Sequence, residues 1–159
     1  MEAWQHWHKA RDAREFFRSV PRTVSEMERW RVVADEGVDA LALPVSHGGG
    51  SGVSDPTANR AIWLADHDDS VRAEAIKKVR QCEERIGAAL IVIEYVRTYL
   101  GEKYADSLEL HYVDCLSISA TAHELQAGRT TVKGRICVAC DWLDSLPTST
   151  IFGFRPPMV

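Results

Sequence analysis

Residues 118–143 read ISATAHELQAGRTTVKGRICVACDWL, and the spacing of apolar residues in this stretch decides the fold. Apolar or small residues recur at three- and four-residue steps on both sides of a short gap, a pattern typical of two amphipathic helices. These positions are Ile118, Thr121, Ala122 and Leu125 in the first helix, and Val132, Ile136, Ala139, Cys140 and Leu143 in the second. Because only residues 126–129 separate the two, the stretch predicts short helices joined by a tight turn.

Two short helices joined in this way, with polar residues at the start of the second, meet the requirements of a helix-turn-helix. Ala122 is small enough to lie where the helices cross, and Leu125 and Val132 would close the core between them. The second helix would then enter the major groove of DNA, where Arg and Lys donate to guanine or phosphate and Thr contacts phosphate or a thymine methyl. The predicted DNA-binding residues are Arg129, Thr130, Thr131, Lys133, Gly134 and Arg135.

The residues before this pair also predict helices. Residues 104–117 indicate a further short helix, marked by Leu108, His111, Tyr112 and Cys115. Residues 57–103 contain no internal proline and indicate one long helix, or a hairpin with a break near His67. Two rows at heptad spacing run along this segment, Val79, Ile86, Ile93 and Leu100 in one, and Ala75, Cys82, Ala89 and Val96 in the other. The rows suit a homodimer seam and equally an intramolecular hairpin.

Residues 1–37 predict an N-terminal helical arm. Trp4, Trp7, Phe16 and Phe17 lie on a helical stripe in residues 2–20, which we interpret as core or, preferably, as an interface. We expect Pro21 to end this helix. A second helix would begin at Thr23 or Ser25, where an acid follows three residues on, and would end at Gly37.

Glycine and proline divide the rest of the chain. Residues 38–56, VDALALPVSHGGGSGVSDP, predict a flexible linker. Residues 148–159 predict a tail that frays or docks through Ile151, Phe152 and Phe154. The expected organisation is an all-α protein with an arm (1–37), a linker (38–56), a long helix or hairpin for dimerisation or interaction (57–103), a helix-turn-helix (104–147) and a tail (148–159).

The segment HYVDCLSISATAHELQAGRTTVKGRICVACDWLDSL, residues 111–146, resembles region 4 of sigma-70-type factors. Thr131, Val132 and Lys133 are its best-matched part. Together with GGGSGVSDPTANRAI before a long helix, it resembles the phage and prophage regulators of the ArpU/RinA type, over roughly residues 22–146. The sequence departs from this family at Gln126, where a turn glycine is common, at Gly128, where Ser or Thr is the usual cap, and at Gly134. The resemblance implies control of late, packaging or lysis genes.

The charge of the chain limits how it could bind DNA. Lys and Arg total 19 against 23 Asp and Glu, a net charge of −4 with a sequence pI near 5.9, which excludes a generally basic coat. Residues 104–159 hold four bases and six acids, a net charge of −2, but three of the bases lie in residues 129–135. We expect local contact, aided by a dimer or by docking on RNA polymerase.

The spacing of glycines, acids and cysteines in the sequence gives little support for an enzyme site or a metal site. The GGGSG segment lacks the Lys-Ser/Thr ending of a P-loop, and the acids around His67 lack the spacing of a calcium loop. Cys137 and Cys140 form a C-x-x-C that could meet His123 or Cys115, but no second pair follows at zinc-site spacing, so packed reduced thiols are the expectation. We predict no enzyme activity, no cofactor and no metal.

The sequence therefore predicts a sequence-specific DNA-binding transcription regulator of phage or prophage late genes, which binds double-stranded DNA. The longest uncharged apolar stretch, residues 86–93, is far shorter than the ~20 residues of a membrane span, and no secretory pattern opens the chain, so we expect the cytoplasm of a bacterial host. The alternative is a helical protein-interaction module whose degenerate helix-turn-helix binds RNA polymerase or another phage or host protein.

Overall fold

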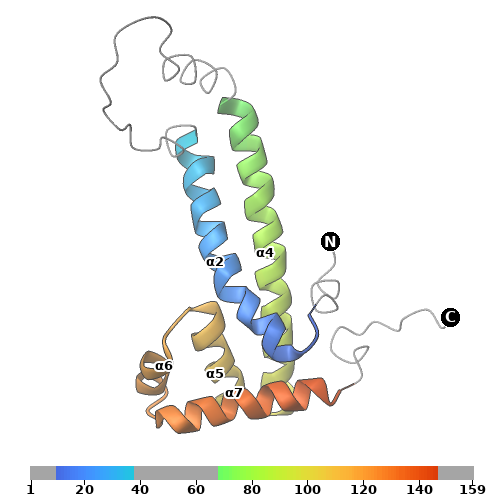
Figure 1. Cartoon of the computed structure of the whole chain (residues 1–159), viewed down its shortest axis with the longest axis vertical. Coiled ribbons are helices and arrows are strands. Elements are labelled where there is room, and N and C mark those ends of the chain that lie inside the picture. Colours follow the sequence, from blue (N-terminus) through green and yellow to red (C-terminus); the bar gives the residue numbers. More distant parts are fainter. Residues whose placement is uncertain (1–9, 38–67, 147–159) are drawn as a thin grey trace, which may run out of the picture. The chain divides into compact units, whose positions relative to one another are not determined.

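The computed structural model describes residues 10–37 and 68–146, and all regular structure in these two ranges is helical (Figure 1). The elements in chain order are α2 (Ala13–Glu36), α4 (Asp68–Tyr99), α5 (Glu102–Leu108), the π-helix η2 (Glu109–Val113), α6 (Ile118–Glu124) and α7 (Arg129–Asp144). The predicted all-α class is confirmed for the described residues. The predicted linker and tail, and both Trp4 and Trp7, lie outside them.

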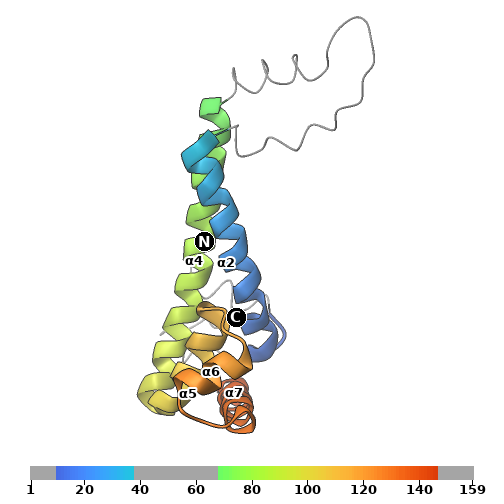
Figure 2. The same cartoon turned by 90° about the vertical axis from the view of Figure 1, so that its left-hand side faces the viewer.

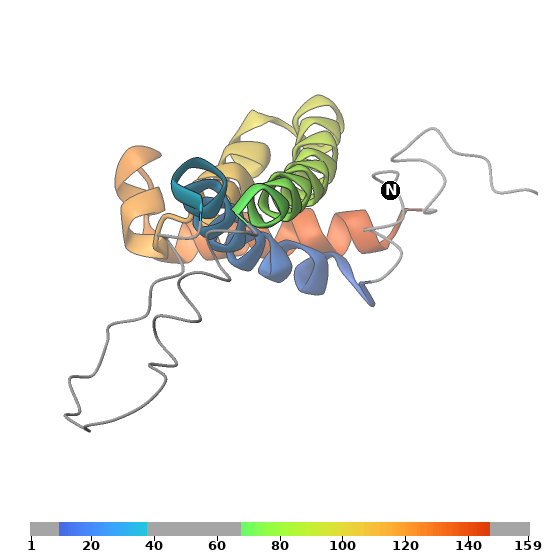
Figure 3. The same ribbon diagram turned by 90° about the horizontal axis from the view of Figure 1, so that it is seen from above.

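The described residues form two compact units. The first comprises the chain up to Ser25 and from Cys82 onward, and the second spans residues 26–81. The division differs from the predicted one, because the start of α2 belongs with α5, α6 and α7 instead of forming a separate arm. In the first unit this start lies beside α7, as Figures 2 and 3 show.

Helix α2 continues through Pro21, so the predicted helix end there is wrong. Proline removes one backbone donor, which ordinarily breaks a helix interior. The carbonyl that loses its helical donor is that of Phe17, and the nearby hydroxyls donate elsewhere, Ser19 Oγ to Phe16 O at 2.6 Å and Thr23 Oγ1 to Ser19 O at 3.1 Å. Burial of Phe17 and other apolar side chains of α2 contributes favourable free energy to this helix. The local sequence does not show this burial.

Helix α2 also begins later than predicted within the described residues. Residues 10–12 are not helical, and the helix begins at Ala13. Asp12 supplies the N-cap, since its Oδ1 accepts a hydrogen bond from the backbone N–H of Glu15 at 2.7 Å.

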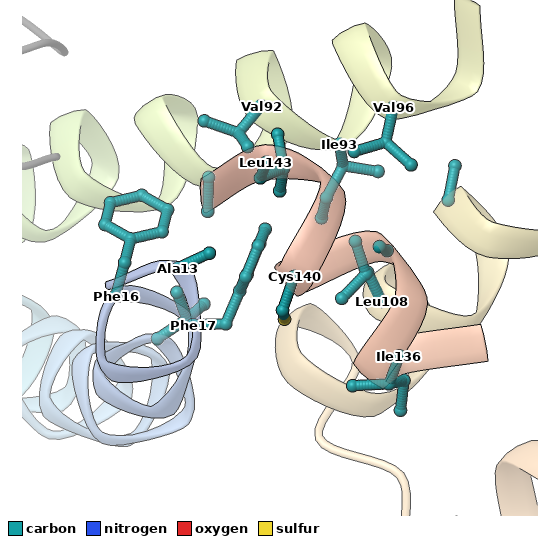
Figure 4. Close-up of a cluster of buried hydrophobic side chains, with 14 of the residues drawn as sticks. Ala13, Phe16, Phe17, Val92, Ile93, Val96, Leu108, Ile136, Cys140 and Leu143 are labelled. Atoms are coloured by element: carbon teal, nitrogen blue, oxygen red, sulfur yellow. The ribbon is translucent and has the colours of Figure 1, made fainter. Parts of the chain in front are cut away.

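One hydrophobic core fills the first unit (Figure 4). Phe17 of α2, Ile93 of α4 and Leu143 of α7 converge there, and each is at most 1% exposed. All five apolar positions predicted for the second helix of the pair are buried: Val132, Ile136, Ala139, Cys140 and Leu143. The core positions of α7 were therefore predictable from their spacing alone.

The heptad rows of α4 pack within the chain. The row Ala75, Cys82, Ala89 and Val96 is buried throughout, and in the other row Ile93 is buried while Val79, Ile86 and Leu100 are half-buried. Ala89, Ile93 and Val96 belong to the core of the first unit. Of the two arrangements that the rows allowed, intramolecular packing is the one observed at these positions.

In the second unit the end of α2 contacts the start of α4. Gly37 follows α2 with a φ of +67°, which confirms the predicted helix stop. Arg72 of α4 donates to the carbonyl oxygens of Ala34 at 3.1 Å and Asp35 at 2.6 Å, and to the Asp68 carboxylate at 2.7 Å. The positive φ of Gly37 strains any residue with a Cβ, and such a Cβ would also displace the ends of the Asp68 and Arg72 side chains, so the position favours glycine.

Candidate nucleic-acid interface

Helices α6 and α7 pack against each other across a short turn (Figure 1). Ser117 caps α6, since its Oγ accepts from the Ala120 N–H at 3.1 Å. The turn comprises residues 125–128, one position earlier than predicted, because α7 already begins at Arg129. The backbone N–H of Ala127 donates to Ala122 O at 2.9 Å and holds the turn against α6.

Gln126 has a φ of +47°, the left-handed conformation that glycine adopts most easily. It is the position at which the resemblance leads one to expect a turn glycine. Gly128 precedes α7 in an extended conformation and offers no side-chain cap. The turn is thus strained at Gln126, and α7 begins without a side-chain cap at Gly128.

The contact between α6 and α7 is closely packed. Ala122 is 5% exposed and Val132 is fully buried, as expected for the crossing point, while Leu125 is half-buried beside them. Thr121 is also fully buried, and within the described residues its hydroxyl has no hydrogen-bond partner. This packing fixes which face of α7 remains exposed.

The start of α7 brings most of the predicted DNA-binding residues onto one exposed surface. Arg129, Thr130, Thr131, Lys133 and Gly134 are exposed, whereas Arg135 is half-buried. Arg129 Nη1 donates to Ser119 Oγ of α6 at 3.1 Å, which links the two helices on this surface. Arg135 lies two turns before Trp142, on the flank of α7 away from Lys133.

A Cβ added to Gly134 would meet no atom within 4 Å. Glycine is therefore not required there by the packing of the protein. Because glycine has no side chain, the backbone of α7 is openly accessible at this position.

Four of the six acids that make residues 104–159 acidic have partners in the first unit. Asp106 and Glu109 accept hydrogen bonds from Arg97 of α4, and the bond to Asp106 is the largest cause of the raised pKa of that guanidinium. Asp141 pairs with Arg14 of α2 at 2.6 Å, and Asp144 accepts from the Ala13 N–H at 2.8 Å. The acids of α7 are thus held at its C-terminal half by α2, away from Arg129 and Lys133.

These acid partners were missed from the sequence. Arg14 and Asp141 are 127 positions apart, and no local pattern relates them. Such a pair becomes apparent only once the tertiary structure brings α2 against α7.

The C-x-x-C motif divides between core and surface. Cys140 is fully buried, and burial raises the pKa of its thiol to about 12, while Cys137 is exposed. Because the two sulfurs lie in such different surroundings, the motif does not present paired ligands. Among the described residues no group of three or more His, Cys, Asp and Glu side chains is arranged to hold a metal ion.

Comparison of the chain with protein-family models, with curated proteins and with solved structures yields no match. None of the described helices combines the length and the apolar character needed to cross a membrane.

Proposed function

We propose that this chain is a sequence-specific DNA-binding transcription regulator, with α7 as the recognition helix in the major groove. The observation that carries the proposal is the joint exposure of Arg129, Thr130 and Lys133 at the start of α7, next to the closely packed contact with α6. Recognition helices contact base edges from their N-terminal residues, so cationic and hydroxyl side chains are needed at this end.

Each side chain has a role that its chemistry allows. Lys133 and Arg129 donate to guanine O6 and N7 or to phosphate, and Thr130 contacts phosphate or a thymine methyl, with Thr131 beside it. Arg135 lies on the flank and holds a phosphate. Gly134 lets the DNA approach the α7 backbone closely, since a side chain would project from this exposed position.

We further propose that the pair is of the sigma-70 region 4 type and that the protein controls late genes of a phage or prophage in the cytoplasm of its bacterial host, like the ArpU/RinA regulators it resembles. The left-handed turn at Gln126 supports this, because it lies where these regulators have a glycine. RNA polymerase and a second copy of the chain are the proposed protein partners.

The test is selection from a pool of random duplex DNA at low and moderate salt. Wild type should enrich a motif, and an Arg129→Ala, Lys133→Ala double variant should lose it. The control is a Lys77→Ala, Lys78→Ala variant, which removes the same charge from the part of α4 in the second unit. The control should enrich the wild-type motif. A palindromic motif would indicate a dimer.

Failure to enrich any motif at either salt would overturn the proposal, as would a double variant that selects the same motif as wild type. Loss of enrichment in the control variant as well would mean that overall charge, and not the α7 surface, governs binding.

A second candidate is the protein-interaction module, favoured by an exposed apolar surface on the first unit. The rings of Tyr95 and Tyr99 lie 4.5 Å apart, and Tyr95 stacks on Trp142 of α7 at 5.8 Å. Tyr99 is 66% exposed, and Ile91 and Val138 are exposed as well. Grouped exposed apolar residues often mark protein interfaces. Salt-insensitive binding of purified RNA polymerase, lost in Tyr99→Ser, would support this candidate.

A further inference from the structure

The first half of α2 exposes a row of arginines that the recognition surface of α7 does not include. Arg14, Arg18 and Arg22 follow one another at four-residue steps and therefore share one face of the helix. Arg18 and Arg22 are exposed, and Arg14 is half-buried. The row stays aligned because α2 is continuous through Pro21.

The opposite face of α2 is buried in the core, which fixes the direction of the row. Ala13, Phe17 and Val20 are at most 3% exposed and pack in the core of the first unit. The arginines must consequently point away from this core. Adjacent like charges weaken a helix, so the row is not explained by the stability of α2.

Contacts with α7 fix where the row begins. Arg14 Nη2 lies 2.6 Å from Asp141 Oδ1, and the Ala13 N–H donates to Asp144. The ring of Phe17 stacks on Tyr112 with centroids 5.4 Å apart. The row therefore starts at the C-terminal half of the helix whose N-terminal half carries Lys133.

Two acids near the row already have arginine partners, and a third, Glu26, lies four residues beyond Arg22 on α2. Asp141 pairs with Arg14, and Glu15 accepts from the backbone and side chain of Arg11. In the described part of the chain neither Arg18 nor Arg22 makes an ion pair. Two guanidinium groups are thus left facing solvent on one helical surface. Guanidinium groups match phosphate oxygens in shape and charge.

We propose that Arg18 and Arg22 bind backbone phosphates of the same duplex that α7 reads. This inference rests on the proposed function and adds a second contact surface to it. Phosphate contacts fix the register and orientation of a protein on DNA without reading sequence. They also explain how a chain with a net charge of −4 holds a polyanion, since the positive charge is concentrated on two neighbouring helices.

The experiment measures Kd for an enriched duplex and for a scrambled duplex across a range of salt concentrations. Arg18→Gln and Arg22→Gln are the test variants, because glutamine keeps helix propensity while removing the charge. Lys103→Gln is the matched control, an exposed lysine of α5 in the same unit. Arg18→Lys tests whether charge alone is sufficient.

Each test variant should reduce the slope of log Kd against log salt by about 0.9 and weaken binding about three- to tenfold, equally on both duplexes. Lys103→Gln should leave the slope unchanged, and Arg18→Lys should restore most of it. Test variants with the slope of wild type would overturn this inference and leave the α7 proposal standing.

The two proposals fail in different ways. Duplex binding without any enriched motif, but with a slope that Arg18→Gln still lowers, would support the arginine row and overturn sequence reading by α7. Absence of duplex binding by wild type at every salt concentration would overturn both.

Discussion

Gln126 has a φ of +47° in the turn between α6 and α7, a conformation in which a β-carbon is strained. Replacing it by glycine removes this strain but makes the unfolded chain more flexible, and the first effect should exceed the second. We expect Gln126→Gly to raise the free energy of unfolding by about 0.5–1 kcal/mol in urea denaturation. Gln126→Ala keeps the β-carbon and should give no such gain. A destabilised Gln126→Gly would show that the turn is not left-handed.

Gly134 and Gly87 form a matched pair of helical glycines. Neither has any atom within 4 Å of an added Cβ, so alanine at either position should stabilise its helix by about 1 kcal/mol in the same denaturation experiment. Gly134 lies on the proposed DNA surface of α7, whereas Gly87 lies on α4. Gly134→Ala should therefore weaken DNA binding while Gly87→Ala should not. Equal DNA affinities in both variants would exclude close approach of DNA at Gly134.

At the scale of elements, local periodicity predicted α7 well and α2 poorly. The buried face of α7 repeats with the helical period, so Val132, Ile136 and Leu143 identify it without reference to any other segment. The continuation of α2 through Pro21 depends instead on burial of Phe17 against α4 and α7. Such burial is set by the tertiary structure, which single-sequence propensity does not contain.

The absence of tertiary information in the sequence also limited the prediction of the candidate site. Exposure at the start of α7 was predictable from its own spacing, but the arginine row required α2 to be continuous. Arg18 and Arg22 lie on either side of Pro21, and the sequence placed Arg18 in the first expected helix and Arg22 in the break before the second. Because the helix boundary was predicted incorrectly, the arginines of α2 were not recognised as one surface.

Two acids of α7 contact α2, and their contributions to stability differ. Asp144 accepts from the Ala13 N–H, one of the donors that have no partner inside a helix, and acts as a cap supplied from another element. Asp144→Ala should lower the free energy of unfolding by about 0.5–1 kcal/mol in urea denaturation. Asp141 makes an exposed ion pair with Arg14, and such pairs contribute little. Asp141→Ala should thus be the milder change, and the reverse order would contradict this account.

At the scale of the whole molecule, the net charge of the chain says little about the charge that a ligand meets. Arg97 binds Asp106 and Glu109, and Arg14 binds Asp141, so acids that dominate the composition are compensated within the first unit. The clustering of basic residues in residues 129–135 was apparent from the sequence. The compensation itself depends on pairs distant in sequence and could be known only from the structure.

The division into two units predicts that the second can be loosened without loss of the first. Alanine at Gly37 would be strained at a φ of +67° and would collide with Asp68 and Arg72, which hold the end of α2. A destabilisation of at least about 1 kcal/mol follows, which corresponds to about fivefold faster amide hydrogen exchange in this unit. Glu36→Ala, at an exposed neighbouring helix position, is the control and should leave exchange nearly unchanged.

Hydrogen exchange measured residue by residue on the Gly37→Ala variant should therefore rise in residues 26–36 and 71–81 and stay at its wild-type rate in α7. DNA affinity should remain that of wild type, because the surface of α7 and the arginines at positions 18 and 22 belong to the first unit. Faster exchange in α7, accompanied by weaker DNA binding, would show that the two units unfold together and that the recognition surface depends on both.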